Sequence, residues 1–199
     1  MTGTPLTRVT LPPGLADSDV SVDPAGATLY VSAAHVAQGA ARGGLVMLEY
    51  DARNGRELAA ASGGLIRASV AGAELTAVPG GVWASFRTGM MGLTIHLGAN
   101  GLRMIAPPGH GIALGRLPGV FDWAMYEATA YGGGALWVAN QAGIVACLDP
   151  ATGEIRASEH LSQPQLIYQL EAIDPASRMI FALHIGDLLQ ITPPRGCWS

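Results

Sequence analysis

The sequence is poor in charge and in long apolar runs. Only 13% of its 199 residues are charged, and 11 basic against 15 acidic residues give a net charge of −4. No Lys/Arg cluster favours nucleic acid or an anionic membrane surface as a partner. No apolar run reaches the roughly 20 residues of a membrane-spanning helix. The start, MTGTPLTRVTLPPG, lacks the basic beginning and apolar centre of a secretory signal.

Recognisable catalytic patterns are missing as well. The five histidines have neither H-x-H nor H-E-x-x-H spacing, so the sequence does not predict a zinc site. No G-x-S-x-G elbow is present. The glycines around His110 and the triplet at Gly132 do not open a helix, so neither predicts a phosphate loop. We therefore assign no catalytic residue and no cofactor, and expect a protein that is not an enzyme.

The sequence is rich in turn-forming residues, with 27 glycines and 13 prolines. This composition favours many short strands over a few long helices. Gly132–Ala157 is the clearest example. Ala135–Asn140 and Ile144–Asp149 are short apolar strands, and the turn Asp149-Pro-Ala-Thr-Gly153 leads into a third, more polar strand. The stretch predicts an antiparallel meander in an all-β protein.

The Trp137 strand recurs along the chain. Tyr30, Trp83, Trp137 and Phe181 stand at the same place in similar strands, 53, 54 and 44 residues apart. These periods are close to those of β-propeller blades. We predict one β-propeller-like domain over residues 1–199 with about four antiparallel blades. The expected blades are 18–62, 69–106, 125–158 and 168–192.

Leu6–Leu11 alternates like a strand and has no inner partners before it, so we expect a detached outer strand at residues 6–11. If it pairs with Leu188–Thr192, the ring closes and a free sheet edge disappears. The alternatives are an open or incomplete array, as in a piece of a larger propeller, and another all-β arrangement. The sequence leaves these three open.

Three stretches of the sequence resemble a known group of proteins. ALWVAN with the following CLDPATGEIRA, the weaker turn Tyr50–Gly55 and the strand TLYVS are similar to repeats of YVTN and quinoprotein-like β-propellers. The resemblance runs from about Ser18 to the end and implies a propeller fold. It does not imply one function, because the group includes quinone dehydrogenases, a streptogramin-type lyase and binding scaffolds. The tail ITPPRGCW resembles the ends of secreted bacterial propellers. It implies an extracytoplasmic location if the chain continues upstream; otherwise the location is unassigned.

The two cysteines, Cys147 and Cys197, lie 50 residues apart. A disulfide between them would tie the tail to the third blade. The alternative is a pair of unrelated thiols, one of them buried as a small hydrophobe. Sequence alone does not establish that the two can reach each other.

An acidic residue stands near the start of each expected innermost strand. The four residues are Asp19, Glu74, Glu127 and Glu171. In a propeller such strands line the axial channel, so four carboxylates at one level would attract a hard divalent cation or a cationic ligand. The alternative is structural, with each carboxylate accepting backbone amides of its own or the next blade.

A second candidate site is aromatic. Phe121, Trp123 and Tyr126 lead out of the long Pro107–Ala124 insertion, directly before Glu127. Aromatic rings on a loop suit recognition of a small molecule or peptide. Ordinary packing of the loop against the blades is the alternative.

Taken together, the sequence predicts a non-catalytic binding module whose ligand is an unknown protein or small molecule. The competing prediction is an enzyme that uses a cation or cofactor at the axial channel, as the lyase and quinoprotein relatives do. Carboxylates held by backbone amides would favour the first, and polar groups converging on a metal or quinone would favour the second.

Overall fold

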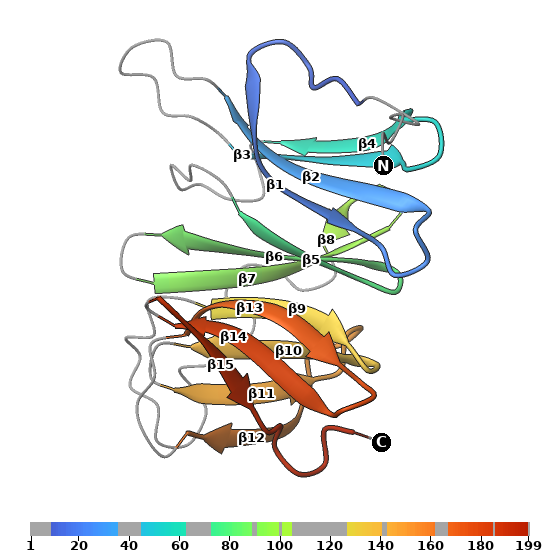
Figure 1. The fold of residues 1–199 in the computed structure, drawn as a ribbon. Helices are drawn as coiled ribbons and strands as arrows, with labels where there is room; N and C mark the ends of the chain where they lie inside the picture. The colour runs from blue at the N-terminus through green and yellow to red at the C-terminus, as the bar shows by residue number, and fades with distance from the viewer. Residues whose placement is uncertain are drawn as a thin grey trace, which may run out of the picture.

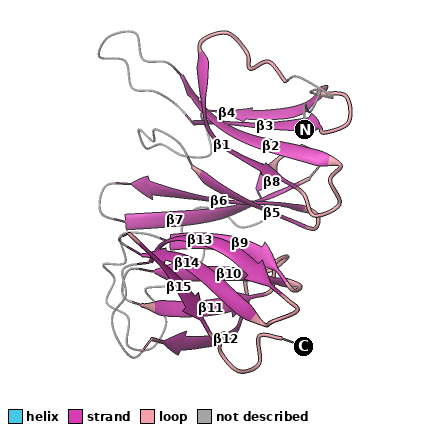
Figure 2. Ribbon diagram, in the orientation of Figure 1, coloured by secondary structure: helices cyan, strands magenta, loops and turns pink. Residues whose placement is uncertain are grey.

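The computed structural model describes residues 9–35, 45–62, 73–88, 91–99, 101–104, 127–140, 143–161, 167–184 and 186–198. These residues form strands and turns with no helix (Figure 2). No helix among them is therefore long and apolar enough to cross a bilayer. The predicted all-β class is confirmed.

The strands form four antiparallel sheets in chain order, which we call the first to fourth blades (Figure 1). The first blade contains β1 (Leu15–Val22), β2 (Thr28–His35), β3 (Leu45–Asp51) and β4 (Glu57–Ser62). The second contains β5 (Glu74–Val78), β6 (Gly81–Thr88), β7 (Met91–Gly98) and β8 (Arg103–Met104). The third contains β9 (Glu127–Gly132), β10 (Ala135–Asn140), β11 (Ile144–Leu148) and β12 (Ile155–His160). The fourth contains β13 (Ile167–Asp174), β14 (Met179–His184) and β15 (Asp187–Ile191).

The turns follow the chemistry expected from the sequence. Asp149 Oδ1 accepts the N–H groups of Ala151 and Thr152 at 2.9 and 3.0 Å. Gly153 closes the same turn at a φ of 74°, a conformation that suits glycine. Asp23 accepts the N–H groups of Ala27 and Thr28 in the first blade. These acidic side chains are therefore occupied within their own turns.

The innermost strands line up in chain order. β1 packs along β5, β5 along β9, and β9 along β13, so each blade meets the next one face to face. Three apolar clusters fill the three joints between blades. The recurring aromatic residue of each of the first three blades points into the following joint: Tyr30 lies with Leu75 of the second blade, Trp83 with Leu136 of the third, and Trp137 with Ile180 of the fourth.

The predicted closure by the N-terminal strand is not found in the described residues. Val9–Leu11 form no strand there, and Val9 and Leu11 pack on a cluster that contains Val31 and Leu48 of the first blade. The described sheet of the fourth blade ends at β15 with three strands. The physical reason is that the outward face of the first blade is itself apolar and gains burial from the nearest segment of chain. Residues 6–8 and most of the two expected insertions lie outside the described part.

Candidate functional site

The innermost strands place only two of the four predicted carboxylates at equivalent positions. Asp19 lies opposite Ser32 and Glu74 opposite Ser85, in each case two residues after the aromatic residue of the blade. Glu127 lies opposite Asn140, one residue further along. A one-residue step turns a side chain to the other face of a sheet. The register therefore does not group Glu127 with Asp19 and Glu74; the side chain of Glu127 is outside the described residues.

Glu171 also departs from this level. It falls in a register shift of β13, between Leu170 opposite Ala182 and Ala172 opposite Phe181. Its side chain is exposed. The structure thus brings together Asp19 and Glu74, and it leaves Glu171 on the surface.

The carboxylate of Asp19 joins the first two blades. The N–H of Leu75 donates to Asp19 Oδ2 at 2.6 Å, and two residues along, the N–H of Ala77 donates to Ser21 Oγ at 2.9 Å. Ser32 Oγ adds a bond in the other direction, to the carbonyl oxygen of Ala73 at 2.7 Å. Side chains of the first blade therefore bond to backbone groups of β5 and of Ala73, directly before it, on the side where β5 has no neighbouring strand in its own sheet.

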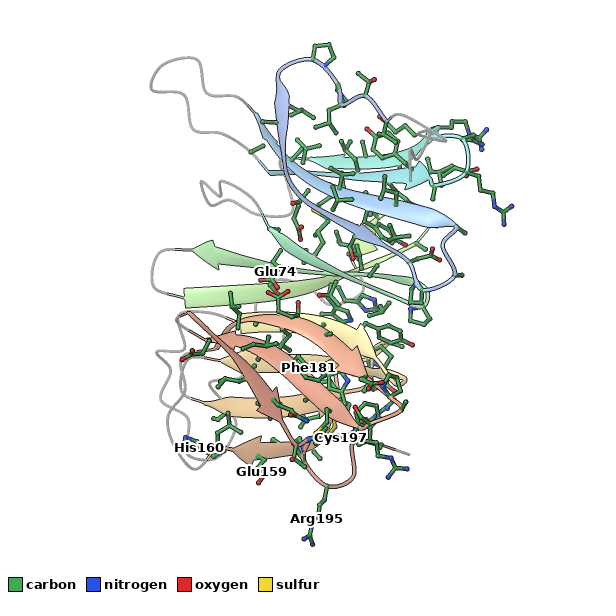
Figure 3. The ribbon with its side chains drawn as sticks, viewed as in Figure 1. Glu74, Glu159, His160, Phe181, Arg195 and Cys197 are labelled. Carbon is green, nitrogen blue, oxygen red and sulfur yellow. A yellow bond between two sulfur atoms is a disulfide. The ribbon has the colours of Figure 1, made fainter. Side chains whose placement is uncertain are left out.

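Glu74 repeats the arrangement between the second and third blades. Figure 3 shows it at the boundary of the two sheets. Burial raises the pKa of Glu74 to about 7, the N–H of Thr129 acts to lower that pKa, and the charge of Asp19 raises it further. Two residues along, Thr76 Oγ1 and Thr129 Oγ1 share a hydrogen bond of 2.6 Å. Near neutral pH this carboxyl group exchanges a proton, which is a property of general bases and of pH-sensitive contacts.

The donor set at this place is small. Among the described residues, no group of three or more His, Cys, Asp and Glu side chains could hold a metal ion. Calcium takes about six to eight oxygen ligands. Asp19 and Glu74 supply two carboxylates, both already accepting amide hydrogens.

Sequence reasoning missed the hydroxyl groups that accompany the carboxylates. Ser21 and Thr76 each stand two residues after an acidic residue, in Asp19-Val-Ser21 and Glu74-Leu-Thr76. This D/E-x-S/T repeat was visible in the sequence and marks side chains on the same face of a strand.

A buried histidine lies against Trp83, the recurring aromatic residue, or anchor, of the second blade. The rings of His96 and Trp83 stack with centroids 4.4 Å apart and planes 8° from parallel. Trp83 Nε1 donates to the carbonyl oxygen of Pro150 at 2.8 Å, so the pair sits against the Asp149–Gly153 turn of the third blade. Burial lowers the pKa of His96, which favours the neutral ring, while a backbone contact with Ala151 acts in the opposite direction.

The cysteines form the disulfide that the sequence left open. Cys147 of β11 and Cys197 of the tail are bonded, with Cα atoms 5.7 Å apart. Trp198 then lies against Trp137, with ring centroids 5.1 Å apart. A side chain at Gly133 would collide with the Trp198 ring, so glycine is needed there for the close approach. The tail is thereby fixed to the third blade. Figure 3 labels Cys197 beside the lower strands.

The predicted aromatic site, Phe121, Trp123 and Tyr126, lies outside the described residues. It stays a prediction.

The stacked sheets define a β-propeller-like fold, and comparison with known proteins agrees. No family model and no curated protein matches the sequence. Among solved structures, BamB from Moraxella catarrhalis is similar at 14% identity and a TM-score of 0.53, over 87% of this chain and 45% of that one. The β-propeller domain of Cps50 (Swd1) from Myceliophteria thermophila is similar at 17% identity and a TM-score of 0.56, over 90% and 52%.

Sqt1 from Saccharomyces cerevisiae is similar at 12% identity and a TM-score of 0.53, covering 90% of this chain and 60% of its own. At such identities the likeness establishes the fold alone. The chain spans about half the length of these solved structures, at 45%, 52% and 60% of theirs.

Proposed function

We propose that this chain is a non-catalytic binding module built on a β-propeller-like fold. The observation that carries the proposal is the use made of the innermost carboxylates. Asp19 accepts the N–H of Leu75 and Glu74 accepts the N–H of Thr129, so both hold the next blade in place. A group committed to a backbone amide is poorly available to a substrate, because its release leaves a partly buried donor unpaired.

The alternative is an enzyme that uses the axial face. It rests on the pKa of about 7 at Glu74, since a carboxyl group near neutrality suits proton transfer. A divalent cation between Asp19 and Glu74 belongs to this alternative. It requires further ligands beyond these two carboxylates.

Metal analysis separates the two. The purified chain is dialysed against a chelator, its metal content is measured, and calcium or magnesium is then added while thermal unfolding is followed. The binding module predicts no stoichiometric metal and an unchanged unfolding temperature. A bound metal, with a rise in unfolding temperature that Glu74→Gln abolishes, would favour the axial-face enzyme. Glu159→Gln, which alters an exposed carboxylate of β12, is the control.

For ligand contact we propose Phe121, Trp123 and Tyr126. The support is chemical, since aromatic rings bury large areas at low entropic cost. A panel of peptides and small molecules is screened by thermal shift, and Trp123→Ala and Tyr126→Ala are compared with the unmodified chain. Loss of a hit in both variants supports the loop as the contact site. A hit that both variants retain moves the site elsewhere.

We also propose a YVTN or quinoprotein-like relationship and an extracytoplasmic location. The Cys147–Cys197 disulfide supports the location, because structural disulfides persist mainly in oxidising compartments. Expression of the chain in an oxidising and in a reducing compartment tests it. Equal stability of the two products would argue against a need for the oxidising one.

A further inference from the structure

The last blade exposes a face that the other blades bury. Tyr30, Trp83 and Trp137 are 1%, 1% and 0% exposed because the following blade covers them. Phe181 occupies the same position on β14 and is only half-buried. On the same face, Leu183 and Leu188 lie opposite each other and are 40% and 63% exposed. In the first three blades the equivalent face packs on the next blade. In the described part of the chain, no further blade packs on this face of the fourth blade.

The first blade exposes the complementary half. In the second blade, Leu75 and Ala77 face the first blade and are 6% and 5% exposed. Val20 and Val22 occupy the same register positions on β1, one residue before and one residue after the partner of the recurring aromatic residue. They are 50% and 51% exposed. Val20 and Val22 thus form an exposed apolar surface on β1, equivalent to the surface of β5 that packs on the preceding blade.

Exposed apolar side chains in the described part of the chain concentrate at these two places. Four of the six large ones, Val20, Val22, Leu183 and Leu188, belong to the two end faces. The other two, Leu58 and Ile155, lie on the outer strands β4 and β12. Val9 and Leu11 cover the part of the first blade around Val31 and Leu48 and leave Val20 and Val22 open. Most of the exposed large apolar side chains therefore lie on faces equivalent to those that form the joints between blades.

The two halves lie at opposite ends of one chain (Figure 1). The chain also matches only 45% to 60% of the length of the propellers it resembles. We propose that two copies associate head to tail, with the fourth blade of each packed on the first blade of the other. Two joints of this kind bury all four exposed side chains and close a ring with twofold symmetry. A contact between two fourth blades would leave Val20 and Val22 exposed, so it fits the structure less well.

The mass of the chain in solution tests the proposal. Light scattering during gel filtration is expected to give twice the 20.5 kDa of one chain at micromolar concentration. Val20→Glu and Leu188→Glu place a charge in each half of the joint and are expected to give single chains. Ile155→Glu, at a side chain 40% exposed on β12 of the third blade and therefore away from both end blades, should keep the double mass. All three positions are exposed, so circular dichroism and thermal unfolding should confirm folded variants.

Mixing the two single-chain variants distinguishes this ring from other assemblies. Combined Val20→Glu and Leu188→Glu chains retain one intact joint, because the unaltered fourth blade of one meets the unaltered first blade of the other. The mixture should recover part of the double mass, which neither variant reaches alone. A single-chain mass for the unmodified protein overturns the proposal, as does a double mass that Val20→Glu leaves unchanged. Open-ended larger assemblies also overturn it, since the ring closes at two copies.

Discussion

The first and last joints between blades both contain an apolar cluster, but they differ in the further bonds that link their two blades. The first is crossed by hydrogen bonds from side chains to backbone, from Asp19, Ser21 and Ser32, and by the N–H of Gly101 bonding to Glu49 Oε2 at 3.0 Å. The last is an apolar cluster fixed by the Cys147–Cys197 disulfide. Sheet stacking therefore needs matched apolar faces, whereas the fastening can be polar or covalent.

The difference between the two joints corresponds to a difference in how much of each end blade is covered. The first blade has four strands, and Val9 and Leu11 cover part of its outward face. The fourth has three described strands and an exposed outward face, so it gains burial from one neighbour only. A covalent link compensates for that smaller gain, because it limits the freedom of the unfolded chain.

Removal of the disulfide should have the largest effect. Cys147→Ala with Cys197→Ala is expected to lower the free energy of unfolding by about 4 kcal/mol, since the bond closes a loop of 50 residues. Denaturant unfolding measures the loss. Reduction of the unmodified chain is the control and should produce a similar change. A loss below about 1 kcal/mol would mean that apolar packing alone holds the last joint.

Glu74 should make the middle of the array sensitive to pH. Its pKa is raised from 4.5 to about 7, so the folded state holds a proton that the unfolded state releases between these values. Stability from this group is complete below pH 4.5 and is lost as the pH rises through 7. Glu74→Gln should therefore match the unmodified chain at low pH and exceed it above pH 7 by up to about 3 kcal/mol.

The measurement is the free energy of unfolding across this pH range. Glu159→Gln changes an exposed carboxylate of β12 and should leave the pH profile unaltered. A Glu74→Gln profile parallel to that of the unmodified chain at every pH would show that Glu74 is not the group responsible.

Asp19→Ala tests the polar fastening of the first joint. The N–H of Leu75 loses its carboxylate acceptor, so unfolding should become easier by about 2 kcal/mol. The pKa of Glu74 should also fall, because the charge of Asp19 raises it. Asp187→Ala, at an exposed position of β15, is the control. If Asp19→Ala costs no more than this control, the Asp19 hydrogen bond does not fasten the first joint.

The repeating elements could be predicted from sequence because their causes are local. The anchors Tyr30, Trp83 and Trp137 occupy β2, β6 and β10 as expected. Aspartate at the start of a turn and glycine near its end also work within a few residues. Phe181 reaches the expected place on β14, yet it is half-buried, because its exposure depends on whether another blade follows.

The candidate carboxylate site could be predicted only in part. The number of residues between a carboxylate and the recurring aromatic residue does not by itself give the register of the two paired strands. Asp19 and Glu74 lie 11 and 9 residues before their anchors but share a level, since the turn between β1 and β2 is longer than that between β5 and β6. Glu127 precedes a turn as short as that of Glu74 and stands one residue further from its anchor. Turn lengths, considered together with these spacings, would have shown that Glu127 is not at the level of Asp19 and Glu74. The disulfide could not be predicted from spacing, because its formation depends on the path by which the tail returns to β11.

The smallest effect is expected from an ion pair within one blade. Arg156 and Asp149 lie 2.8 Å apart, with side chains 33% and 34% exposed. The Arg156 side chain lowers the pKa of Asp149 from 3.8 to about 2, so the contribution is present above pH 3.8 and is lost as the pH falls through 2. Solvent screens the pair, and Arg156→Ala should cost less than about 1 kcal/mol in denaturant unfolding at neutral pH. The two chains should converge near pH 2. A cost as large as that of Asp19→Ala would mean that contacts between blades are no stronger than surface contacts within one.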